Sequence, residues 1–231
     1  MWIEAGLAAG STVGFLSWAV RGRSSRIFAP SVWRGPSGHR RIALTFDDGP
    51  SESTPALLEL LDRHNAKATF FVCGHNAERL PHVLRAIAAA GHEIGNHTWS
   101  HRRLDFAPST AMRDEIGRTQ EIIRAVTGKS PKLFRAPYGV RWPGLRGVQK
   151  EFNLTGVMWT TIGRDWKLPA AAIASRILNT AFDGAILCLH DGRGLQPRPD
   201  IGPTLGAVAE VLPGLTQRNL SITSVSAILE R

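Results

Sequence analysis

Short apolar segments alternate with longer amphipathic segments through most of the chain, and this alternation constrains the fold more than any other feature. The apolar segments predict strands at 42–46, 68–73, 92–96, 132–135, 155–160, 185–190 and 220–223. The intervening segments repeat apolar residues at helical spacing and predict helices that begin near Thr54 and Leu80 and others at 109–127, 170–181 and 205–212. Strands that alternate with crossover helices form parallel sheets, and continuously apolar strands suit a sheet buried on both faces. The sequence therefore predicts an α/β domain with a parallel sheet, closed as a barrel or open and doubly wound.

The first residues differ from the rest because nearly all of them are apolar or small. From Trp2 to Val20 the only charged residue is Glu4, and about 20 apolar residues suffice to span the hydrocarbon core of a bilayer. We expect residues 1–22 to form a hydrophobic helix that anchors the protein to a membrane; the alternative is a helix or arm packed on the domain. Residues 23–40 are rich in Ser, Gly, Pro and Arg, and predict a linker that leads to the domain at 41–231.

Arginines follow this apolar segment at Arg21, Arg23 and Arg26, whereas a cleavable signal peptide carries its positive charges before the apolar run. Positive charge favours the cytoplasmic side of a membrane, which would keep the domain in the cytoplasm. Glycines repeat every four residues inside the segment and would allow two such helices to pack closely. A dimer formed through the anchor is therefore one arrangement, and the sequence leaves the oligomeric state open.

The net charge of +9 and the pI near 10.7 favour a polyanionic partner such as a cell wall, an anionic lipid or a nucleic acid. The basic residues are scattered and accompany no nucleic-acid-binding motif, so we expect no nucleic-acid partner. The two cysteines, Cys73 and Cys188, are too few for a disulfide scaffold and are expected to be reduced core residues.

Polar and ionisable residues follow the predicted strands where each strand ends. They are Asp47-Asp48, His97 with His101, Arg135 with Tyr138, Asp165-Trp166, and His190-Asp191. In a barrel of parallel strands the carboxyl ends share one rim, and enzymes with this fold build their active sites there. The order of these groups along the chain therefore favours a catalytic site over a set of unrelated surface residues.

Two of these groups have the composition of a metal site. If a helical turn begins at His97, the i, i+4 spacing places His97 and His101 on one face, and two histidines with one carboxylate leave a coordination position open for water. Asp47 and Asp48 repel each other, and adjacent residues of an extended chain point in different directions. One can bind a cation while the other faces a substrate. The simpler alternatives are two surface histidines and an aspartate turn before Gly49.

The remaining groups suit proton transfer and charge stabilisation. His190 changes charge near neutral pH and could donate a proton, and Asp165 could orient it or raise its pKa. Arg135 could pair with Asp47 and keep it ionised. The turn at Tyr138 offers backbone N–H groups that could stabilise an oxyanion. Each residue also has a purely structural explanation, and it is their combination that favours catalysis.

At this point the chain resembles the polysaccharide deacetylase family, also known as NodB-homology or carbohydrate esterase family 4 proteins. The resemblance covers about Arg41 to Ile228 and depends on five ordered motifs. These are Thr45-Phe46-Asp47-Asp48-Gly49-Pro50, His97-Thr98-Trp99-Ser100-His101, Arg135-Ala136-Pro137-Tyr138-Gly139, Asp165-Trp166 and Leu187-Cys188-Leu189-His190-Asp191. The resemblance implies a distorted (β/α) barrel of seven or eight mostly parallel strands. It also implies metal-dependent removal of acetyl groups from N-acetylglucosamine units of a polysaccharide or oligosaccharide, either peptidoglycan or a chitin-like glycan.

The resemblance also implies a role for each matched residue. Asp48, His97 and His101 would bind one divalent metal, Zn²⁺ or alternatively Co²⁺ or Ni²⁺. Asp47 would be the general base and Arg135 its partner. His190 would be the general acid, tuned by Asp165, and the Tyr138 N–H would bind the oxyanion. Trp166 and Leu189 match positions that line the acetyl-methyl pocket, and Tyr138 would also contact the substrate. The chain departs from the family pattern at Ile162, where another aspartate is common.

The motifs leave two alternatives and one conflict open. An O-acetyl esterase would use the same base, metal and acid on an acetylated glycan such as xylan. A catalytically silent, membrane-associated glycan-binding protein is the second alternative, although such a protein would normally have lost a ligand or the base. The family's substrates usually lie outside the cytoplasmic membrane, so we expect a membrane-anchored catalytic domain that faces the cell envelope, against the cytoplasmic side that the arginines favour.

Overall fold

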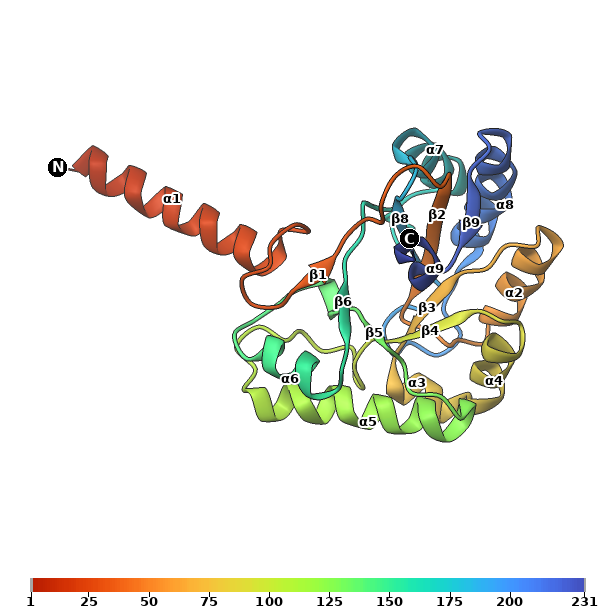
Figure 1. The fold of residues 1–231 in the computed structure, drawn as a ribbon, viewed down its shortest axis with the longest axis horizontal. Helices are drawn as coiled ribbons and strands as arrows, with labels where there is room; N and C mark the ends of the chain where they lie inside the picture. The colour runs from red at the N-terminus through yellow and green to blue at the C-terminus, as the bar shows by residue number, and fades with distance from the viewer. Residues whose placement is uncertain (1, 231) are drawn as a thin grey trace.

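One parallel sheet organises most of the chain, and the computed structural model describes residues 2–230, with side chains from Thr12 onward (Figure 1). The strands are β1 (Ser31–Val32), β2 (Arg41–Asp47), β3 (Thr69–Val72), β4 (Glu93–Asn96), β5 (Leu133–Phe134), β6 (Thr155–Val157), β7 (Thr161–Ile162), β8 (Ile186–His190) and β9 (Ser221–Thr223). Their order in the sheet is β1-β6-β5-β4-β3-β2-β8-β7, with β9 paired to β2, and every pairing between them is parallel. The expected distorted α/β barrel is confirmed, and no pairing among residues 2–230 joins its terminal strands β1 and β7.

Helices surround this curved sheet, whereas the N-terminal helix projects away from it (Figure 1). They are α1 (Trp2–Arg21), α2 (Thr54–Arg63), α3 (Gly74–Arg79), α4 (Pro81–Ala89), α5 (Ser109–Thr127), α6 (Leu145–Glu151), α7 (Ala170–Thr180), α8 (Gly202–Gln217) and α9 (Val225–Leu229). The expected end of the last long helix before Pro213 is wrong, because α8 continues through this proline and buries Leu212 and Leu215 on either side of it. The segment 155–160 is also not one strand, since β6 ends at Val157 and β7 begins at Thr161.

The alternation of side chains along β2 shows why the sheet separates core from site. Ile42, Leu44 and Phe46 are buried in the main core cluster, which also contains side chains of α2, α7 and α8. Thr45 and Asp47 point to the opposite face, where both contact the guanidinium of Arg135. Successive residues of a strand face opposite sides. One strand therefore supplies both the packing under the helices and the polar interior of the barrel.

The register between β2 and its neighbour β8 aligns two of the predicted site residues. Thr45 lies opposite Cys188, Phe46 opposite Leu189, and Asp47 opposite His190. The Thr45 hydroxyl donates a hydrogen bond of 2.8 Å to the Leu187 carbonyl, in addition to the backbone pairing. Asp47 and His190 thus reach the carboxyl edge of the sheet at the same level.

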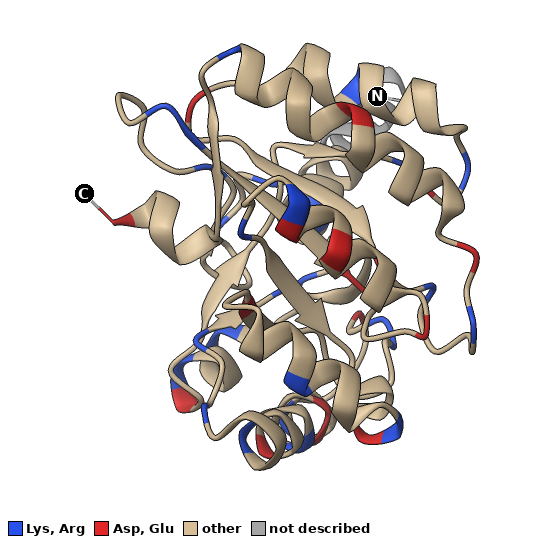
Figure 2. Ribbon diagram, turned by 90° about the vertical axis from the view of Figure 1, so that its right-hand side faces the viewer, with Lys and Arg blue, Asp and Glu red and all other residues tan. Residues whose placement is uncertain are grey.

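The N-terminal segment differs in part from the expectation. Helix α1 projects away from the sheet in Figure 1, and part of the expected linker at 23–40 adds β1 to the sheet beside β6. No helix within the described residues is both long enough and apolar enough to cross a bilayer. The side chains of residues 2–11, which include about half of the expected anchor and two of its spaced glycines, lie outside the described residues. Lys and Arg are dispersed over the elements seen in Figure 2 and gather on no single helix there.

Candidate active site

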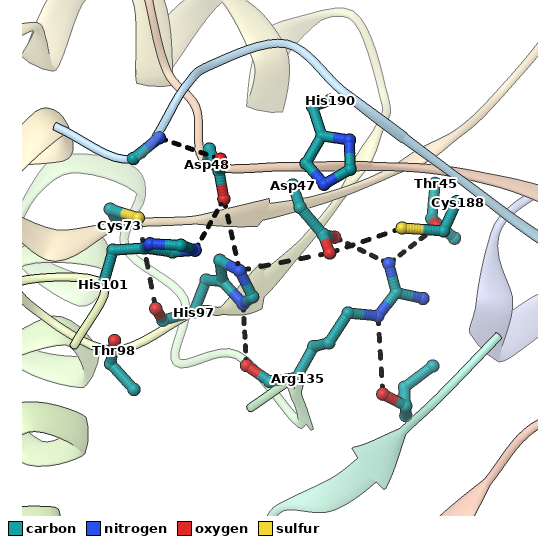
Figure 3. A network of polar contacts seen from close by, with 12 residues as sticks. Thr45, Asp47, Asp48, Cys73, His97, Thr98, His101, Arg135, Cys188 and His190 are labelled. Carbon is teal, nitrogen blue, oxygen red and sulfur yellow. Dashed lines mark hydrogen bonds and ion pairs between the residues drawn. The ribbon is translucent and has the colours of Figure 1, made fainter. Parts of the chain in front are cut away.

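The polar residues that follow the strands meet in one cleft at the carboxyl edge of the sheet, as expected. The cleft has a volume of about 500 Å³. Of the predicted site residues, Asp47, Asp48, His97, His101, Tyr138, Trp166 and His190 line it. Arg135 and Asp165 lie behind the lining, where both side chains are buried and hydrogen-bonded to lining residues (Figure 3 for Arg135).

Asp48, His97 and His101 form a compact set of three potential metal ligands. The Oδ1 atom of Asp48 lies 3.0 Å from His101 Nε2 and 3.4 Å from His97 Nε2 (Figure 3). His97 Nδ1 lies 2.7 Å from the carbonyl oxygen of Arg135, so this nitrogen carries the proton and Nε2 keeps its lone pair for a ligand. Asp48 Oδ1 is buried and has no hydrogen-bond partner among the described residues. A buried carboxylate oxygen without a hydrogen-bond partner, lying beside two imidazole nitrogens, fits a divalent cation.

The ionisation of Asp48 also favours a cation at these three residues. Burial raises the pKa of Asp48, but its contacts with His101 and His97 hold that pKa well below the usual value. Its second oxygen, Oδ2, accepts a hydrogen bond of 2.8 Å from the backbone N–H of Gly194. Asp48 is therefore held as a carboxylate in a fixed orientation, with Oδ1 directed at the histidines.

The two histidines do not lie on a helical turn, which corrects the expectation from their spacing. Residues 97–101 form a loop in which Thr98 and His101 have positive φ of 66° and 56°. Glu115 of α5 holds this loop, because its Oε2 accepts hydrogen bonds from the backbone N–H groups of Trp99 and Ser100 at 2.9 and 2.8 Å. The loop thus turns both imidazoles toward Asp48 without helical geometry, and their rings lie 5.1 Å apart.

Asp47 is held by a buried arginine, as the sequence suggested. Arg135 Nη1 donates to Asp47 Oδ1 at 2.6 Å and to Thr45 Oγ1 at 2.8 Å. The guanidinium lies 4.1 Å from the centre of the Phe71 ring and is fully buried. Charge-assisted hydrogen bonds of this kind are short and directional. Arg135 therefore fixes the orientation of the Asp47 carboxylate at the edge of the cleft.

A thiol on the neighbouring strand contacts the other oxygen of Asp47, and no motif indicated this contact. Cys188 Sγ donates to Asp47 Oδ2 across 3.4 Å. Burial and the nearby charge of Asp47 raise the pKa of this thiol well above its usual value, so it remains protonated and acts as a donor. The β2–β8 register places Cys188 opposite Thr45, on the face of the sheet that Asp47 also occupies. Both oxygens of Asp47 are thus oriented by neighbours.

His190 and Asp165 form a buried ion pair on the opposite side of Asp47. Asp165 Oδ1 lies 2.8 Å from His190 Nδ1, and Asp165 Oδ2 accepts from the backbone N–H of His190 at 2.8 Å. Thr204 at the start of α8 donates to the same Oδ2 at 2.7 Å, which sequence patterns did not reveal. Burial lowers the pKa of His190, but the hydrogen bond and charge of Asp165, with the charges of Asp48 and Asp47, raise it to about 9. The imidazole is therefore protonated at neutral pH.

The expected substrate-contacting residues divide into two groups. Tyr138 and Trp166 line the cleft and remain more than half exposed, and Trp166 packs edge-on against His190 at 5.1 Å. Leu189 is fully buried in the main core cluster and is not among the cleft-lining side chains of the described residues, since the β8 alternation turns it toward the helices. Ile162, where the family often has aspartate, lines the cleft as an apolar side chain.

Other residues also line the cleft although no motif contains them. They are Arg21, Trp159, Arg193 and Gly194. Arg193 and Gly194 follow β8 in a loop, and the Arg193 Nη2 donates to the backbone carbonyl of Asp165 at 3.0 Å. The tertiary fold brings Arg21 from α1, more than a hundred residues from most other lining residues. Sequence spacing could not have identified it.

Comparisons with known proteins agree with this geometry. The family model described as polysaccharide deacetylase matches residues 34–157. A peptidoglycan-N-acetylglucosamine deacetylase of Bacillus cereus is 34% identical over 201 residues, which are 86% of this chain and 72% of the relative. A chitooligosaccharide deacetylase of Bradyrhizobium is 34% identical over 195 residues, covering 80% of this chain and 89% of the relative. The match to the deacetylase PgdA of Listeria monocytogenes, at 39% identity, covers only 35% of that protein.

Solved structures show the same similarity in three dimensions. The crystal structure of a peptidoglycan N-acetylglucosamine deacetylase bound to an N-hydroxybenzamide superposes with a TM-score of 0.80 at 34% identity, covering 85% of this chain and 91% of that one. A pseudoenzyme of carbohydrate esterase family 4 from Bacillus anthracis shares the fold at 24% identity, with a TM-score of 0.79 and coverage of 88% and 70%. The fold alone thus does not establish activity, and the site residues must do so. On its family model, its relatives and its site geometry, the chain belongs to the polysaccharide deacetylase family.

Proposed function

We propose that this protein is a metal-dependent hydrolase that removes acetyl groups from N-acetylglucosamine residues of a glycan. The observation that carries the proposal is the arrangement of one cleft, in which a buried carboxylate, a triad of metal ligands and a protonated imidazole face a common space. Hydrolysis of an amide needs these three elements, since water must be activated, the carbonyl polarised and the amine protonated. The relatives named as deacetylases of peptidoglycan N-acetylglucosamine and of chitooligosaccharides support this substrate class.

The metal ligands in this proposal are Asp48, His97 and His101. Two imidazoles and one carboxylate form a donor set that suits Zn²⁺ and leaves a coordination position open, with Co²⁺ and Ni²⁺ as alternatives. When bound, such a cation polarises the acetamide carbonyl and lowers the pKa of water. The chain itself prepares the ligands, because the Arg135 carbonyl fixes the tautomer of His97 and Gly194 orients Asp48.

Asp47 acts as the general base in the first step. It accepts a proton from a water molecule whose oxygen attacks the acetamide carbon, while Arg135 and Cys188 hold the carboxylate in place. The carbonyl oxygen becomes an oxyanion, and the backbone N–H of Tyr138 stabilises it by hydrogen bonding. Trp159, Trp166 and Ile162 surround this position with apolar surface, which suits the acetyl methyl group.

His190 acts as the general acid in the second step. Its pKa of about 9 keeps it protonated at neutral pH, and Asp165 occupies Nδ1, so Nε2 donates the proton. That proton passes to the sugar nitrogen as the carbon–nitrogen bond breaks, because an unprotonated amine is a poor leaving group. The products are acetate and a glucosamine residue. Base and acid remain on separate residues, which agrees with their separate ion pairs to Arg135 and Asp165.

Acetate release by the purified full chain tests this proposal. We expect metal-dependent release from N-acetylglucosamine oligomers and peptidoglycan, none after chelation, and a fall of about 10² to 10⁴ in rate for Asp47→Asn and for His190→Ala. Near-full turnover of Asp47→Asn with metal bound would contradict the base assignment. Acetylated xylan in the same assay distinguishes O-deacetylation, since faster release from xylan than from N-acetylated glycans would replace the amide with an ester as the substrate bond.

Location follows from the substrate class. Peptidoglycan lies outside the cytoplasmic membrane, so we propose that the catalytic domain faces the cell envelope and that residues 2–20 hold it at the membrane. Protease treatment of intact cells and of inverted vesicles tests the orientation. Digestion of the domain only in vesicles whose cytoplasmic face is exposed would show that it faces the cytoplasm.

A further inference from the structure

One wall of the cleft comes from a segment that precedes the family-matched region. The match begins at residue 34, yet Arg21, the last residue of α1, lines the cleft together with Asp48 and His101. The side chain of Arg21 is exposed and makes no hydrogen bond or ion pair with any described residue. Asp105 is close enough for the charge of Arg21 to lower its pKa, but the carboxylate of Asp105 is itself paired with Arg103. The guanidinium of Arg21 is therefore available to a ligand.

A buried arginine fixes the end of α1 against the domain, so the position of Arg21 is built into the fold. Arg141 Nη1 donates to the Ser25 carbonyl at 2.7 Å and Nη2 donates to the Gly22 carbonyl. Its backbone N–H donates to the Val20 carbonyl at 3.0 Å, and the side chain is almost fully buried. A positively charged guanidinium beside the C-terminus of a helix also interacts favourably with the helix dipole and so stabilises this helix end. Arg141 thus holds the backbone of both neighbours of Arg21 in the chain, Val20 and Gly22.

The acidic side chains of the cleft lie deeper than Arg21, which is exposed. Asp47 and Asp48 are buried, and Asp47 is already matched by Arg135. Two arginines, Arg21 and Arg193, line the same cleft. Arg193 donates to the backbone carbonyls of Gly192 and Asp165, and its Nη1 lies 3.9 Å from the Asp165 carboxylate, whereas Arg21 has no ion-pair partner among the described residues. The cleft therefore offers one cationic side chain, that of Arg21, that the proposed chemistry does not use. A neutral sugar has no need of it.

The cleft continues in a second hollow with the same character. This hollow shares Trp159 and Ile162 with the first and is lined in addition by Arg23 and Arg176. Arg23 reaches it from the same N-terminal segment and is held by a hydrogen bond to the Thr160 carbonyl. Two adjacent hollows that share apolar residues and are both edged by arginine suit consecutive sugars of an acidic polymer.

We propose that Arg21 binds a carboxylate on the sugar next to the N-acetylglucosamine, and so makes this chain selective for an acidic glycan over a neutral one. The inference rests on the proposed deacetylase function and names its substrate class. Glycan strands that have lost their stem peptides carry such a carboxylate on the lactyl group of muramic acid, whereas in peptide-substituted strands this carboxyl is an amide, and chitin oligomers carry none. Arginine recognises carboxylates with two parallel hydrogen bonds, which gives direction as well as charge.

Kinetics on matched substrates test this inference with the full chain. The acidic substrate is a soluble oligomer of alternating N-acetylglucosamine and N-acetylmuramic acid, and the neutral ones are the same oligomer with its carboxylates converted to methylamides and a chitin pentamer. For Arg21→Gln we expect KM on the acidic oligomer to rise about tenfold with kcat within about twofold, as for loss of a charge-assisted contact made equally in ground and transition states. KM on the two neutral substrates should stay unchanged. Arg21→Lys keeps the charge but not the two parallel hydrogen bonds, so it should restore only part of the affinity.

A second arginine variant controls for the general effect of net charge. Arg85 is exposed on α4 and lines neither hollow, so Arg85→Gln lowers the net charge by the same amount and should leave all three substrates unchanged. Added salt should raise the KM of the unmodified protein on the acidic oligomer and affect Arg21→Gln less.

The outcomes separate the inference from the function that it rests on. If the unmodified protein releases acetate from none of the substrates, the proposed function fails. If it is active and Arg21→Gln changes all substrates equally, changes none, or lowers kcat in place of raising KM, the deacetylase function stands and the role of Arg21 is overturned. An equal effect of Arg85→Gln would also overturn it, because net charge and not position would then explain the selectivity.

Discussion

Replacing Asp165 with asparagine removes one negative charge from beside His190 and keeps a side chain of the same shape. In the unmodified protein burial lowers the pKa of His190, and Asp165 contributes the largest opposing effects, with Asp48 and Asp47 adding smaller ones, so the pKa reaches about 9 instead of 6.5. Without Asp165 the burial remains, and the pKa should fall to its ordinary value or below. A general acid works only when protonated, so activity is lost as the pH rises through this pKa.

The size of the effect follows from these values. At pH 7.5 a group with a pKa of about 9 is protonated in about 97% of molecules, and one with the ordinary value of 6.5 in about 10%. We therefore expect Asp165→Asn to lower kcat about tenfold at pH 7.5 and to recover most of that loss near pH 5.5. A cation beside Asp48 lowers both pKa values, so the quantity to compare is the difference between the two proteins.

Acetate release between pH 5 and pH 10 measures the alkaline limb, and an NMR titration of the His190 ring in the chelated protein measures the pKa itself. Asp105→Asn serves as a control, because this carboxylate is paired with Arg103 and does not contribute to the pKa of His190. If Asp165→Asn lowers the rate by the same factor at every pH, Asp165 only positions the ring and the electrostatic explanation is wrong.

Three further predictions test other parts of the structure. His97→Ala should lose stoichiometric zinc, measured by elemental analysis of the dialysed protein, and with it all acetate release; metal retained at one ion per chain would contradict the ligand set. Asp191 is fully buried, and burial raises its pKa from 3.8 to about 7, so the unfolded chain ionises first and stability is lost as the pH rises from about 4 to 7. Asp191→Asn in chelated protein should therefore be more stable above pH 7 by up to about 4 kcal/mol in urea unfolding and nearly unchanged at pH 4, and parallel profiles would refute this. Arg141→Met should release the end of α1, raise proteolysis near Arg21 and reproduce the KM change of Arg21→Gln on the acidic oligomer, whereas an unchanged digestion pattern would show that other contacts hold the helix.

Much of the site could be predicted because a parallel sheet sends all of its carboxyl ends to one edge. Asp47 and His190 were identified from two apolar strands that end in polar residues, and strand pairing then placed them side by side. The pairing of Arg135 with Asp47 followed from charge alone. Such predictions succeed when periodicity within one strand decides which way a side chain points.

The rest depended on contacts between distant segments, which periodicity does not encode. The loop that joins His97 to His101 takes its shape from Glu115 on α5, so their spacing suggested a helical turn that does not form. Thr204 reaches Asp165 from the start of α8, and Arg21 reaches the cleft from α1. In each case no sequence pattern near the residue indicates its contact, because the packing of helices and strands against one another determines which distant residue lies beside it.

The register of β2 against β8 has a consequence for how this chemistry is maintained. Asp47 and His190 are direct neighbours across two strands, and neighbouring strands lie about 4.8 Å apart whatever their side chains are. The separation of the two backbones that carry the proposed proton acceptor and proton donor is therefore set by the sheet. Core substitutions can alter the stability of the sheet without altering that separation. A shift of the β2–β8 register by one residue would place Leu189 or Asp191 beside Asp47 and remove the proton donor. The hydrogen bonds between the two strands therefore hold the proposed base and acid next to each other.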